Sequence, residues 1–232
     1  MDYQEWHPVY EAILSDFGYP RSGDEQARDR LAALLGDDET FDPDALELAG
    51  RTVAVAGGAP SLTEEVDVAA GADRVVAAST AADRLLDAGV TVDCVVTDLD
   101  KHPDTVVDLT RAGTPVAVHA HGDNVDLLES TVSECDPAAV LPTTQAAPAD
   151  GVRNFGGFTD GDRAAFRADH LDAAELVFPG WEFEDPSVSA EKREKLAWAE
   201  RLLYWLERRR DERFDVLDGR RAGIDRSALP ID

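Results

Sequence analysis

Apolar residues in the first 50 positions recur at the spacing of α-helices. In the first segment they lie at i, i+3, i+4 and i+7 positions: Trp6, Val9, Tyr10, Ile13, Leu14 and Phe17. A second helix is predicted from Ser22 onward, because Ser22 and Glu25 have the spacing of a capping box and Gly36 follows the last apolar position. Residues 1–50 are therefore predicted to be a helical segment.

From Thr52 onward the pattern changes to short apolar runs separated by amphipathic stretches. The runs, each long enough for a strand, are residues 52–56, 74–78, 93–96, 115–120, 138–143 and 175–180. Helical periodicity lies between and after them, at residues 80–88, 103–112, 124–134, 162–171 and 189–209. This alternation of strand and helix is typical of βαβ units.

The apolar runs are continuous, as is typical of strands that are buried on both faces of a sheet. We therefore expect an α/β fold with a mainly parallel, Rossmann-like sheet flanked by helices. With 232 residues, 44% of them hydrophobic, the chain is long enough for one such core. We expect a small helical N-terminal segment (1–50), an α/β domain that carries the catalytic site (51–210) and a C-terminal extension (211–232).

Composition adds a strong acidic bias. There are 48 acidic and 22 basic residues, which gives a net charge of −26, and the acids are spread along the whole chain. Such a dispersed excess disfavours binding to nucleic acid or to an anionic membrane. It fits a cytoplasm with molar salt, as in a salt-in halophile, where a Debye length of about 3 Å screens the repulsion between surface acids.

Cys94 and Cys135 are far apart in the sequence and lie in or near apolar segments. We predict buried thiols of a reducing compartment, not a disulfide or a zinc site. No apolar run approaches the roughly 18 residues that a membrane helix needs. The first ten residues also lack the basic and apolar regions of a signal peptide. The expected location is the cytoplasm, with no membrane partner, and a homo-oligomer is compatible with the sequence.

Two Asp-x-Asp pairs follow predicted strands: Asp98 with Asp100, and Asp160 with Asp162. Asp is so frequent in this chain that either pair alone is better explained as a solvated turn or a helix cap. Because the strand ends of a parallel sheet meet at one edge, however, both pairs would face the same cleft. Mg²⁺ takes oxygen ligands, usually one or two carboxylates together with substrate phosphates. Taken together, the two pairs favour a metal site.

The stretch "HAHGDN" at residues 119–124 has two explanations. His119 and His121 would share one face of a strand, a spacing found in some zinc hydrolases. The other explanation is one buried histidine and one loop histidine, with Asp123 and Asn124 capping the next helix. The second explanation is favoured, because no third histidine or cysteine lies nearby in the sequence.

Groups that could contact phosphate also occur at the strand ends. The turn "GGAPS", which contains Gly57, Gly58 and Ser61, could bring backbone N–H groups to a phosphate, but a tight strand-to-helix turn explains it equally well. Arg163 directly follows the second Asp pair and is the better phosphate candidate. Lys192 and Lys195, two of only three lysines, open the last helix, and ordinary solvated charge explains them equally well.

At these residues the chain resembles the archaeal 6-hydroxymethyl-7,8-dihydropterin pyrophosphokinases, the MptE-like family. The matching stretches occur in family order over roughly residues 50–206: "GGAPSL", "DCVVTDLD", "HAHGDN", "GFTDGDRA", "FPGWEF" and "KREKL". The combination of "HAHGDN" with "GFTDGDRA" is the most specific of them. Trp181 departs from the family pattern, which has methionine there.

The resemblance implies a catalytic domain similar to thiamin pyrophosphokinase and a Mg²⁺-dependent transfer of diphosphate from ATP to the reduced pterin alcohol, releasing AMP. It implies metal and phosphate binding by Asp98, Asp100, Asp160 and Asp162. Catalytic roles would fall to Asp98, Asp100, His121 and Asp123. Nucleotide contacts would come from Gly57, Gly58, Ser61, Asn124, Arg163, Lys192 and Lys195. The general base is open between an aspartate and His121.

Two other classes of protein stay open. One is a different metal-dependent transferase or hydrolase with Asp-x-Asp loops, for example one acting on a nucleotide-sugar. The other is a non-catalytic module that binds Mg-ATP without turnover. The reaction products distinguish the three, because AMP release from ATP marks the diphosphokinase.

Overall fold

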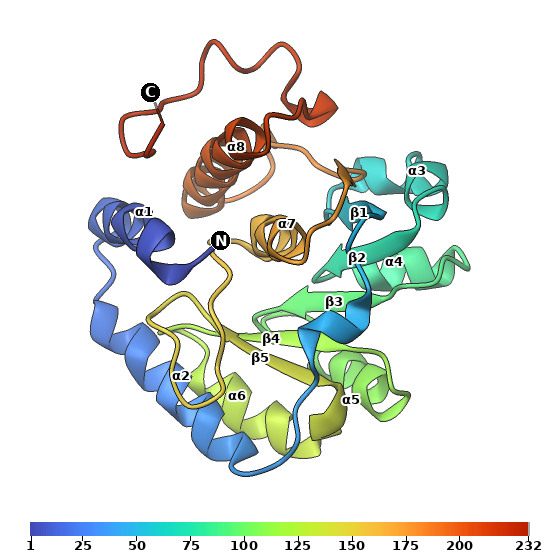
Figure 1. Cartoon of the computed structure of the whole chain (residues 1–232), viewed down its shortest axis with the longest axis vertical. Helices are drawn as coiled ribbons and strands as arrows, with labels where there is room; N and C mark the ends of the chain where they lie inside the picture. The colour runs from blue at the N-terminus through green and yellow to red at the C-terminus, as the bar shows by residue number, and fades with distance from the viewer. Residues whose placement is uncertain (232) are drawn as a thin grey trace.

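The computed structural model describes residues 1–231 and contains one six-stranded sheet in which all strands run parallel (Figure 1). The strands are β1 Thr52–Ala56, β2 Arg74–Ala78, β3 Cys94–Thr97, β4 Val116–Ala120, β5 Val140–Thr144 and β6 Glu175–Val177. Their spatial order is β5-β4-β3-β2-β1-β6, so the last strand pairs with the first. Each predicted apolar run forms a strand, and the prediction of a parallel α/β fold is confirmed.

Helices cover both faces of the sheet. They are α1 Tyr3–Phe17, α2 Arg21–Leu35, α3 Val66–Ala70, α4 Ala81–Asp87, α5 Pro103–Arg111, α6 Val125–Thr131, α7 Asp160–His170 and α8 Ala190–Arg210. Short 3₁₀ helices are η1 Pro43–Leu46, η2 Pro60–Thr63, η3 Val132–Glu134, η4 Pro137–Ala139 and η5 Asp215–Leu217. Figure 1 shows α1, α7 and α8 on one side of the sheet and α2, α5 and α6 on the other.

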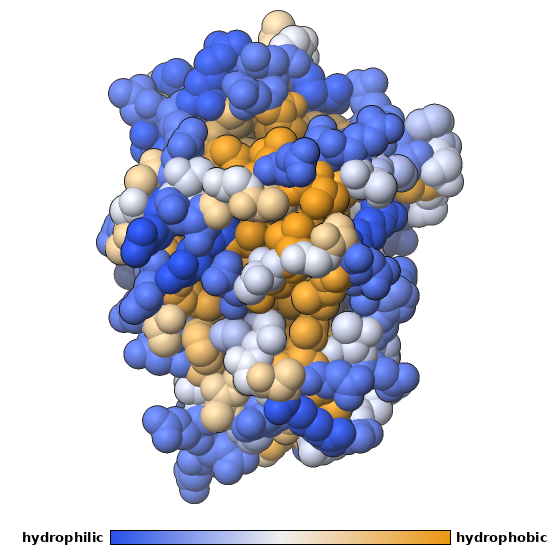
Figure 2. Space-filling model, turned by 90° about the vertical axis from the view of Figure 1, so that its right-hand side faces the viewer, coloured by the Kyte–Doolittle hydropathy of each residue, from blue (hydrophilic) through white to orange (hydrophobic). Residues whose placement is uncertain are grey.

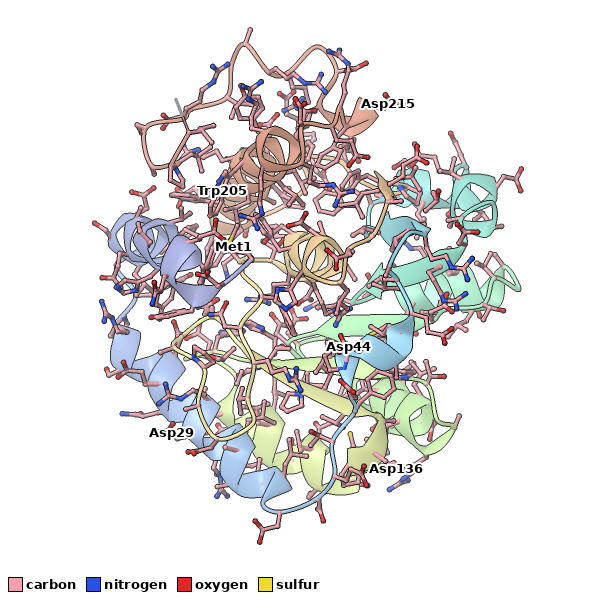
Figure 3. All side chains as sticks on the ribbon, viewed as in Figure 1. Met1, Asp29, Asp44, Asp136, Trp205 and Asp215 are labelled. Carbon is pink, nitrogen blue, oxygen red and sulfur yellow. The ribbon has the colours of Figure 1, made fainter. Side chains whose placement is uncertain are left out.

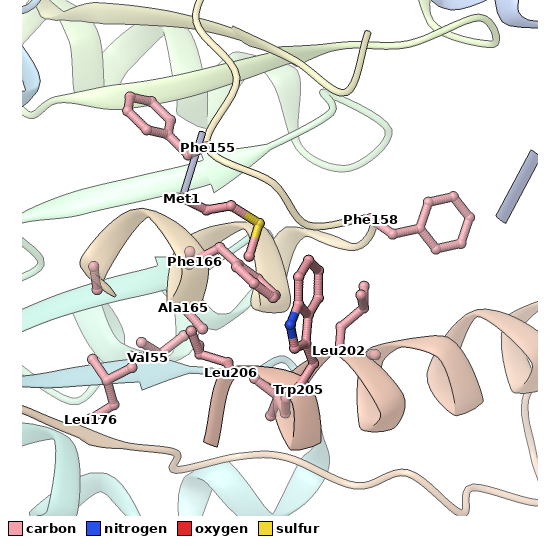
Figure 4. Close-up of a cluster of buried hydrophobic side chains, with 14 of the residues drawn as sticks. Met1, Val55, Phe155, Phe158, Ala165, Phe166, Leu176, Leu202, Trp205 and Leu206 are labelled. Atoms are coloured by element: carbon pink, nitrogen blue, oxygen red, sulfur yellow. The ribbon is translucent and has the colours of Figure 1, made fainter. Parts of the chain in front are cut away.

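The two faces of the sheet bury two separate hydrophobic cores. Successive residues of a strand point to opposite faces, so Val53 and Val55 pack with residues of α1, α7 and α8, while Ala54 and Ala56 pack with α2 and the crossover helices. In the first core Phe166 of α7 lies 5.5 Å from Trp205 of α8, measured between ring centroids (Figure 4). The core under α7 therefore fixes this helix against β1, β2 and β3.

The start of α2 differs from the prediction. The helix begins at Arg21 after Pro20, which provides no side-chain cap, so the predicted capping box at Ser22 and Glu25 is wrong. Pro20 has the fixed φ, here −79°, that leads a chain into a helix without such a cap. The end at Gly36 is confirmed, and α2 packs on α6 and β5.

Residues after α8 pack back onto it. Phe214 and Leu217 are buried in the same core as α8, and the guanidinium of Arg221 donates hydrogen bonds of 2.8 and 2.6 Å to the carboxylate of Glu207. Cys94 and Cys135 are buried free thiols, as predicted. Within residues 1–231, no helix has the length and apolar character needed to cross a bilayer.

The acidic side chains lie mostly on the outside of the fold. Asp29, Asp44, Asp136 and Asp215 are exposed, and Figure 3 shows Asp29, Asp136 and Asp215 toward the edge of the view, whereas Trp205 is buried. Figure 2 shows hydrophilic side chains bordering one face, with a hydrophobic strip between them. A net charge of −26 is therefore concentrated at the surface, where salt can screen it.

We expect the protein to lose its fold below roughly a few tenths molar KCl and to regain it in molar KCl. The reason is the range of the repulsion between surface acids, about 10 Å at 0.1 M salt and about 3 Å at 1 M. Circular-dichroism melts across a KCl series measure this effect. A melting temperature that is the same in dilute and molar KCl would contradict it.

Candidate active site

A cleft of about 500 Å³ opens at the carboxyl ends of β1 to β4, where ligands bind in parallel α/β sheets. Loops after these strands line it, together with the first turns of α7 and α8 and the α1–α2 connection. The sequence-predicted residues that line it are Gly57, Gly58, Asp98, Asp100, His121, Asp123, Asp160, Arg163, Lys192 and Lys195. Ser61, Asn124 and Asp162 are not among the lining residues.

Asp98 lies at the end of β3 in a tight turn. Leu99 has a left-handed backbone with φ of 69°, and its N–H donates to the Thr97 hydroxyl at 3.0 Å. The N–H of Asp100 donates to Oδ1 of Asp98 at 3.2 Å. The turn thereby directs the carboxylate of Asp98 toward the cleft.

His121 faces the second oxygen of Asp98. Its Nε2 lies 3.4 Å from Oδ2 of Asp98. Burial opposes ionisation of Asp98, but the contact with His121 and the charge of Arg163 hold the pKa of this carboxyl well below its usual range. Asp98 is therefore a carboxylate at neutral pH.

Asp160 and Arg163 lie in the first turn of α7 and form an ion pair at 3.0 Å between Oδ1 and Nη1. Burial and the nearby charge of Asp98 raise the pKa of Asp160 to about 8, although the charge of Arg163 opposes the rise. The negative charges of Asp98 and Asp160 would thus repel each other in one region of the cleft. A cation bound in this region would relieve the repulsion.

Asp162, predicted as a metal ligand, does not line the cleft. Its carboxylate is fully buried and accepts hydrogen bonds from the N–H of Phe158 and from the N–H and hydroxyl of Thr159, the latter two at 3.0 and 2.6 Å. Thr159 and Asp162 form a capping box at the start of α7. The helix therefore uses both oxygens of Asp162 to cap its own N-terminus and leaves Asp160 to face the cleft.

Asn124 ties together strand ends instead of lining the cleft. Its amide nitrogen donates to the backbone oxygens of Asp98 and His119 at 2.8 and 2.7 Å, and its oxygen accepts from the N–H of His121 at 3.1 Å. These bonds hold the loop that follows β3 next to the loop that follows β4. Asn124 is a positioning residue for Asp98 and His121.

Ser61 lies in η2, outside the cleft lining, where its backbone oxygen accepts from Glu64 and Glu65. The Gly57 N–H donates to Pro179 O at 2.9 Å. A Cβ on Gly57 would lie 2.4 Å from Gly180 O, and one on Gly180 would lie 2.5 Å from Gly57 O. The glycine turn is thus required for close approach of two backbones, which supports the tight-turn explanation.

Lys192 and Lys195 line the cleft from the first turns of α8. Lys195 pairs with Glu191 at 3.1 Å, and its Nζ lies 5.9 Å from the centroid of the Tyr19 ring. Lys192 is exposed. Both ammonium groups can therefore reach an anion in the cleft with little desolvation.

His119 is the buried histidine of "HAHGDN". Its Nδ1 lies 3.1 Å from the Thr143 hydroxyl, and burial together with the charge of Arg163 lowers its pKa well below the usual value. Among the residues described, no three histidine, cysteine or acidic side chains are grouped as a metal ion would require. The explanation of one buried and one loop histidine is confirmed, but Asn124 makes no side-chain cap at the start of α6, so that part of the prediction is wrong.

Asp24 and Gln145 also line the cleft and were not identified from the sequence. Asp24 accepts from the Tyr10 hydroxyl at 2.7 Å and from Gln145 Nε2 at 2.9 Å, and Gln145 Oε1 accepts from Arg163 Nη2 at 3.2 Å. A buried chain of hydrogen bonds thus runs from α1 to Arg163. The available signal was an acid on the apolar face of α2, which Asp24 shares with Ala27.

Replacing Gln145 by leucine should lower the free energy of unfolding by about 1–3 kcal/mol, because Asp24 and Arg163 would each lose a buried partner. Denaturant melts of the metal-free protein in molar KCl measure this loss. Gln26 is exposed on α2, and its change to leucine is the matched control, expected within about 0.5 kcal/mol of wild type. Equal losses in the two variants would contradict the buried chain.

Three known proteins that are similar to this chain have the same name. Residues 38–187 match the family model described as 6-hydroxymethylpterin diphosphokinase MptE-like. A 6-hydroxymethyl-7,8-dihydropterin pyrophosphokinase of Methanothermobacter thermautotrophicus is 35% identical, over 93% of this chain and 99% of the relative. One of Pyrococcus furiosus is 37% identical, over 89% and 94%. One of Methanocaldococcus jannaschii is 29% identical, over 89% and 96%.

Proposed function

The chain belongs to the family of MptE-like 6-hydroxymethylpterin diphosphokinases, and from this premise we propose that it transfers diphosphate from ATP to 6-hydroxymethyl-7,8-dihydropterin with the help of Mg²⁺. The observation that best supports this proposal is a single cleft. It is lined by acidic groups that follow β3 or lie on α7, and by basic groups on α7 and α8. Phosphoryl transfer depends mainly on positioning and on neutralising charge. A cytoplasmic location is part of the proposal.

The acidic groups fit Mg²⁺ by their chemistry. Asp98, Asp100 and Asp160 present carboxyl oxygens to the cleft, and the charge of Asp98 helps to raise the pKa of Asp160. Because no three such side chains are grouped around one point in the described residues, we assign the metal to one or two of these carboxylates together with substrate phosphates, and leave Asp162 to its helix cap. When bound, Mg²⁺ would supply charge neutralisation at the phosphates.

The basic groups would hold the phosphates of ATP. Arg163 is fixed by Asp160 and Gln145, so its fork is preorganised, whereas Lys192 and Lys195 add mobile charge at the cleft. The pterin hydroxyl oxygen would attack the β-phosphorus, and the bond from that phosphorus to the α–β bridging oxygen would break as AMP leaves. The hydroxyl proton would pass to a cleft base, either an aspartate or His121.

The test is product analysis with purified protein, ATP, Mg²⁺ and the reduced pterin alcohol in molar KCl. We expect AMP and the pterin diphosphate, with formation dependent on both Mg²⁺ and the pterin. Formation of ADP, or turnover without the pterin, would overturn the proposal in favour of another metal-dependent transferase or hydrolase. Binding of Mg-ATP without turnover would indicate a nucleotide-binding module.

A further inference from the structure

A second, much smaller cavity of about 10 Å³ lies behind the cleft, between α7 and strands β3, β4 and β5. This is room for about one water-sized solute. Its polar lining consists of His119, Thr143, Thr144, Arg163 and Arg167. The cavity is separate from the cleft, and Arg163 lines both.

The arginines that line this cavity are buried without full pairing. Arg167 is 2% exposed, and its Nε and Nη2 have no hydrogen-bond partner among the described residues. The Nε of Arg163 and the Nε2 of His119 are unpartnered in the same sense. Three buried guanidinium nitrogens around a one-solute cavity therefore lack an acceptor from the protein.

Arg167 also lacks a counter-charge. Across residues 1–231, no carboxylate lies within ion-pair distance of its guanidinium. The nearby thiol of Cys94 does not provide one, because burial raises its pKa even though the charge of Arg167 opposes the rise. A guanidinium does not lose its proton in a protein, so the buried charge requires compensation.

The hydrogen bonds of Thr143 fix the tautomer of His119. The Thr143 hydroxyl donates to the Val118 carbonyl oxygen at 3.1 Å, and Nδ1 of His119 lies 3.1 Å from the same hydroxyl oxygen. Because the hydroxyl has only one proton, Nδ1 of the neutral imidazole donates to it, and Nε2 carries no proton. The N–H donors of the cavity therefore come from Arg163 and Arg167.

We propose that this cavity binds one small monatomic anion of the halide class, with chloride as the physiological candidate. The anion accepts from Arg167 and from Nε of Arg163, and it neutralises the buried charge. It also holds Arg163 from the side opposite to the cleft. The site is independent of the reaction proposed above, because its ligands act whether or not the cleft is occupied.

A melting experiment at constant ionic strength tests the site in solution. We expect a melting temperature about 5 °C higher in potassium chloride than in potassium acetate, because acetate is too large for the cavity. General salt effects oppose this sign, because excluded ions such as acetate stabilise folded proteins more than chloride does. The difference should vanish in Arg167→Met and persist in Arg208→Met, a control at an exposed position on α8. Equal differences in both variants would overturn the proposal.

A crystallographic test needs only the wild-type protein, so its outcome does not depend on whether a variant folds. Crystals of the wild-type protein grown in potassium bromide should show anomalous scattering from bromide in the cavity. A water molecule in the cavity, with bromide only at surface positions, would refute a halide site. A bromide peak in the cavity that lies beyond contact distance of Arg167 would refute the role given to that residue.

Discussion

Replacing Asp160 by asparagine should lower kcat by about 10²-fold or more, which corresponds to about 2.7 kcal/mol of transition-state stabilisation. The change removes a carboxylate assigned to the metal while it preserves shape and burial. The melting temperature of the metal-free protein should stay equal to wild type or rise, because burial and Asp98 already disfavour the charged form. Turnover and melting curves in molar KCl measure both quantities. Near-wild-type turnover would remove Asp160 from the metal site.

The same isosteric change two residues later is the matched control. In Asp162→Asn, an amide NH₂ would face groups that donate to the buried carboxylate, among them the N–H groups of Phe158 and Thr159. We expect the free energy of unfolding to fall by about 2 kcal/mol, since a buried donor would lose its acceptor. The loss of kcat should be smaller than in Asp160→Asn. The reverse pattern would return Asp162 to the metal site and contradict its capping role.

Replacing Arg163 by methionine should lower kcat by about 10³-fold, the lower end of the range for an arginine that stabilises a transferring phosphoryl group. Arg163→Lys should recover only part of the loss, because lysine keeps the charge but cannot bridge Asp160 and Gln145 as the guanidinium fork does. Kinetics with ATP and the reduced pterin measure this effect. Circular dichroism must accompany them, because removing the guanidinium leaves Asp160 without its partner.

Arg153→Met is the control for a general loss of positive charge. Arg153 is exposed, and its backbone pairs with β5. We expect its kcat to stay within a few-fold of wild type. If Arg153→Met and Arg163→Met lowered kcat to a comparable extent, the loss would be due to the change in net charge and not to the position of Arg163.

The sheet was predictable because strands buried on both faces leave continuous apolar runs. The run at residues 52–56 coincides with β1, and the run at 74–78 coincides with β2. The grouping of Asp98, Asp160 and Arg163 was also predictable, because parallel strands bring their carboxyl ends to one edge. Position along the fold thus predicted which of these side chains share one cleft, even though aspartates are frequent everywhere in this chain.

Side-chain direction within the site was less predictable. Nothing in the sequence distinguishes the roles of Asp160 and Asp162. In the helix, Asp162 is at position N3 and its side chain turns back to the N-cap, whereas Asp160 is at N1 and faces the cleft. Gln145 could not be identified, because its partners Asp24 and Arg163 are distant in sequence. Such contacts depend on how α2 and α7 are placed on opposite faces of the sheet.

The pairing of β1 with β6 has a consequence for synthesis on the ribosome. β1 is the first strand made, but one of its edges stays unpaired until β6 is made, and the Gly57 turn has no partner until Gly180 arrives. A nascent chain that ends before β6 would expose the edge of a buried, apolar strand, which favours association with other chains. Because β6, one of the two partners of β1, is the last strand made, the cleft can be completed only when most of the chain has been translated.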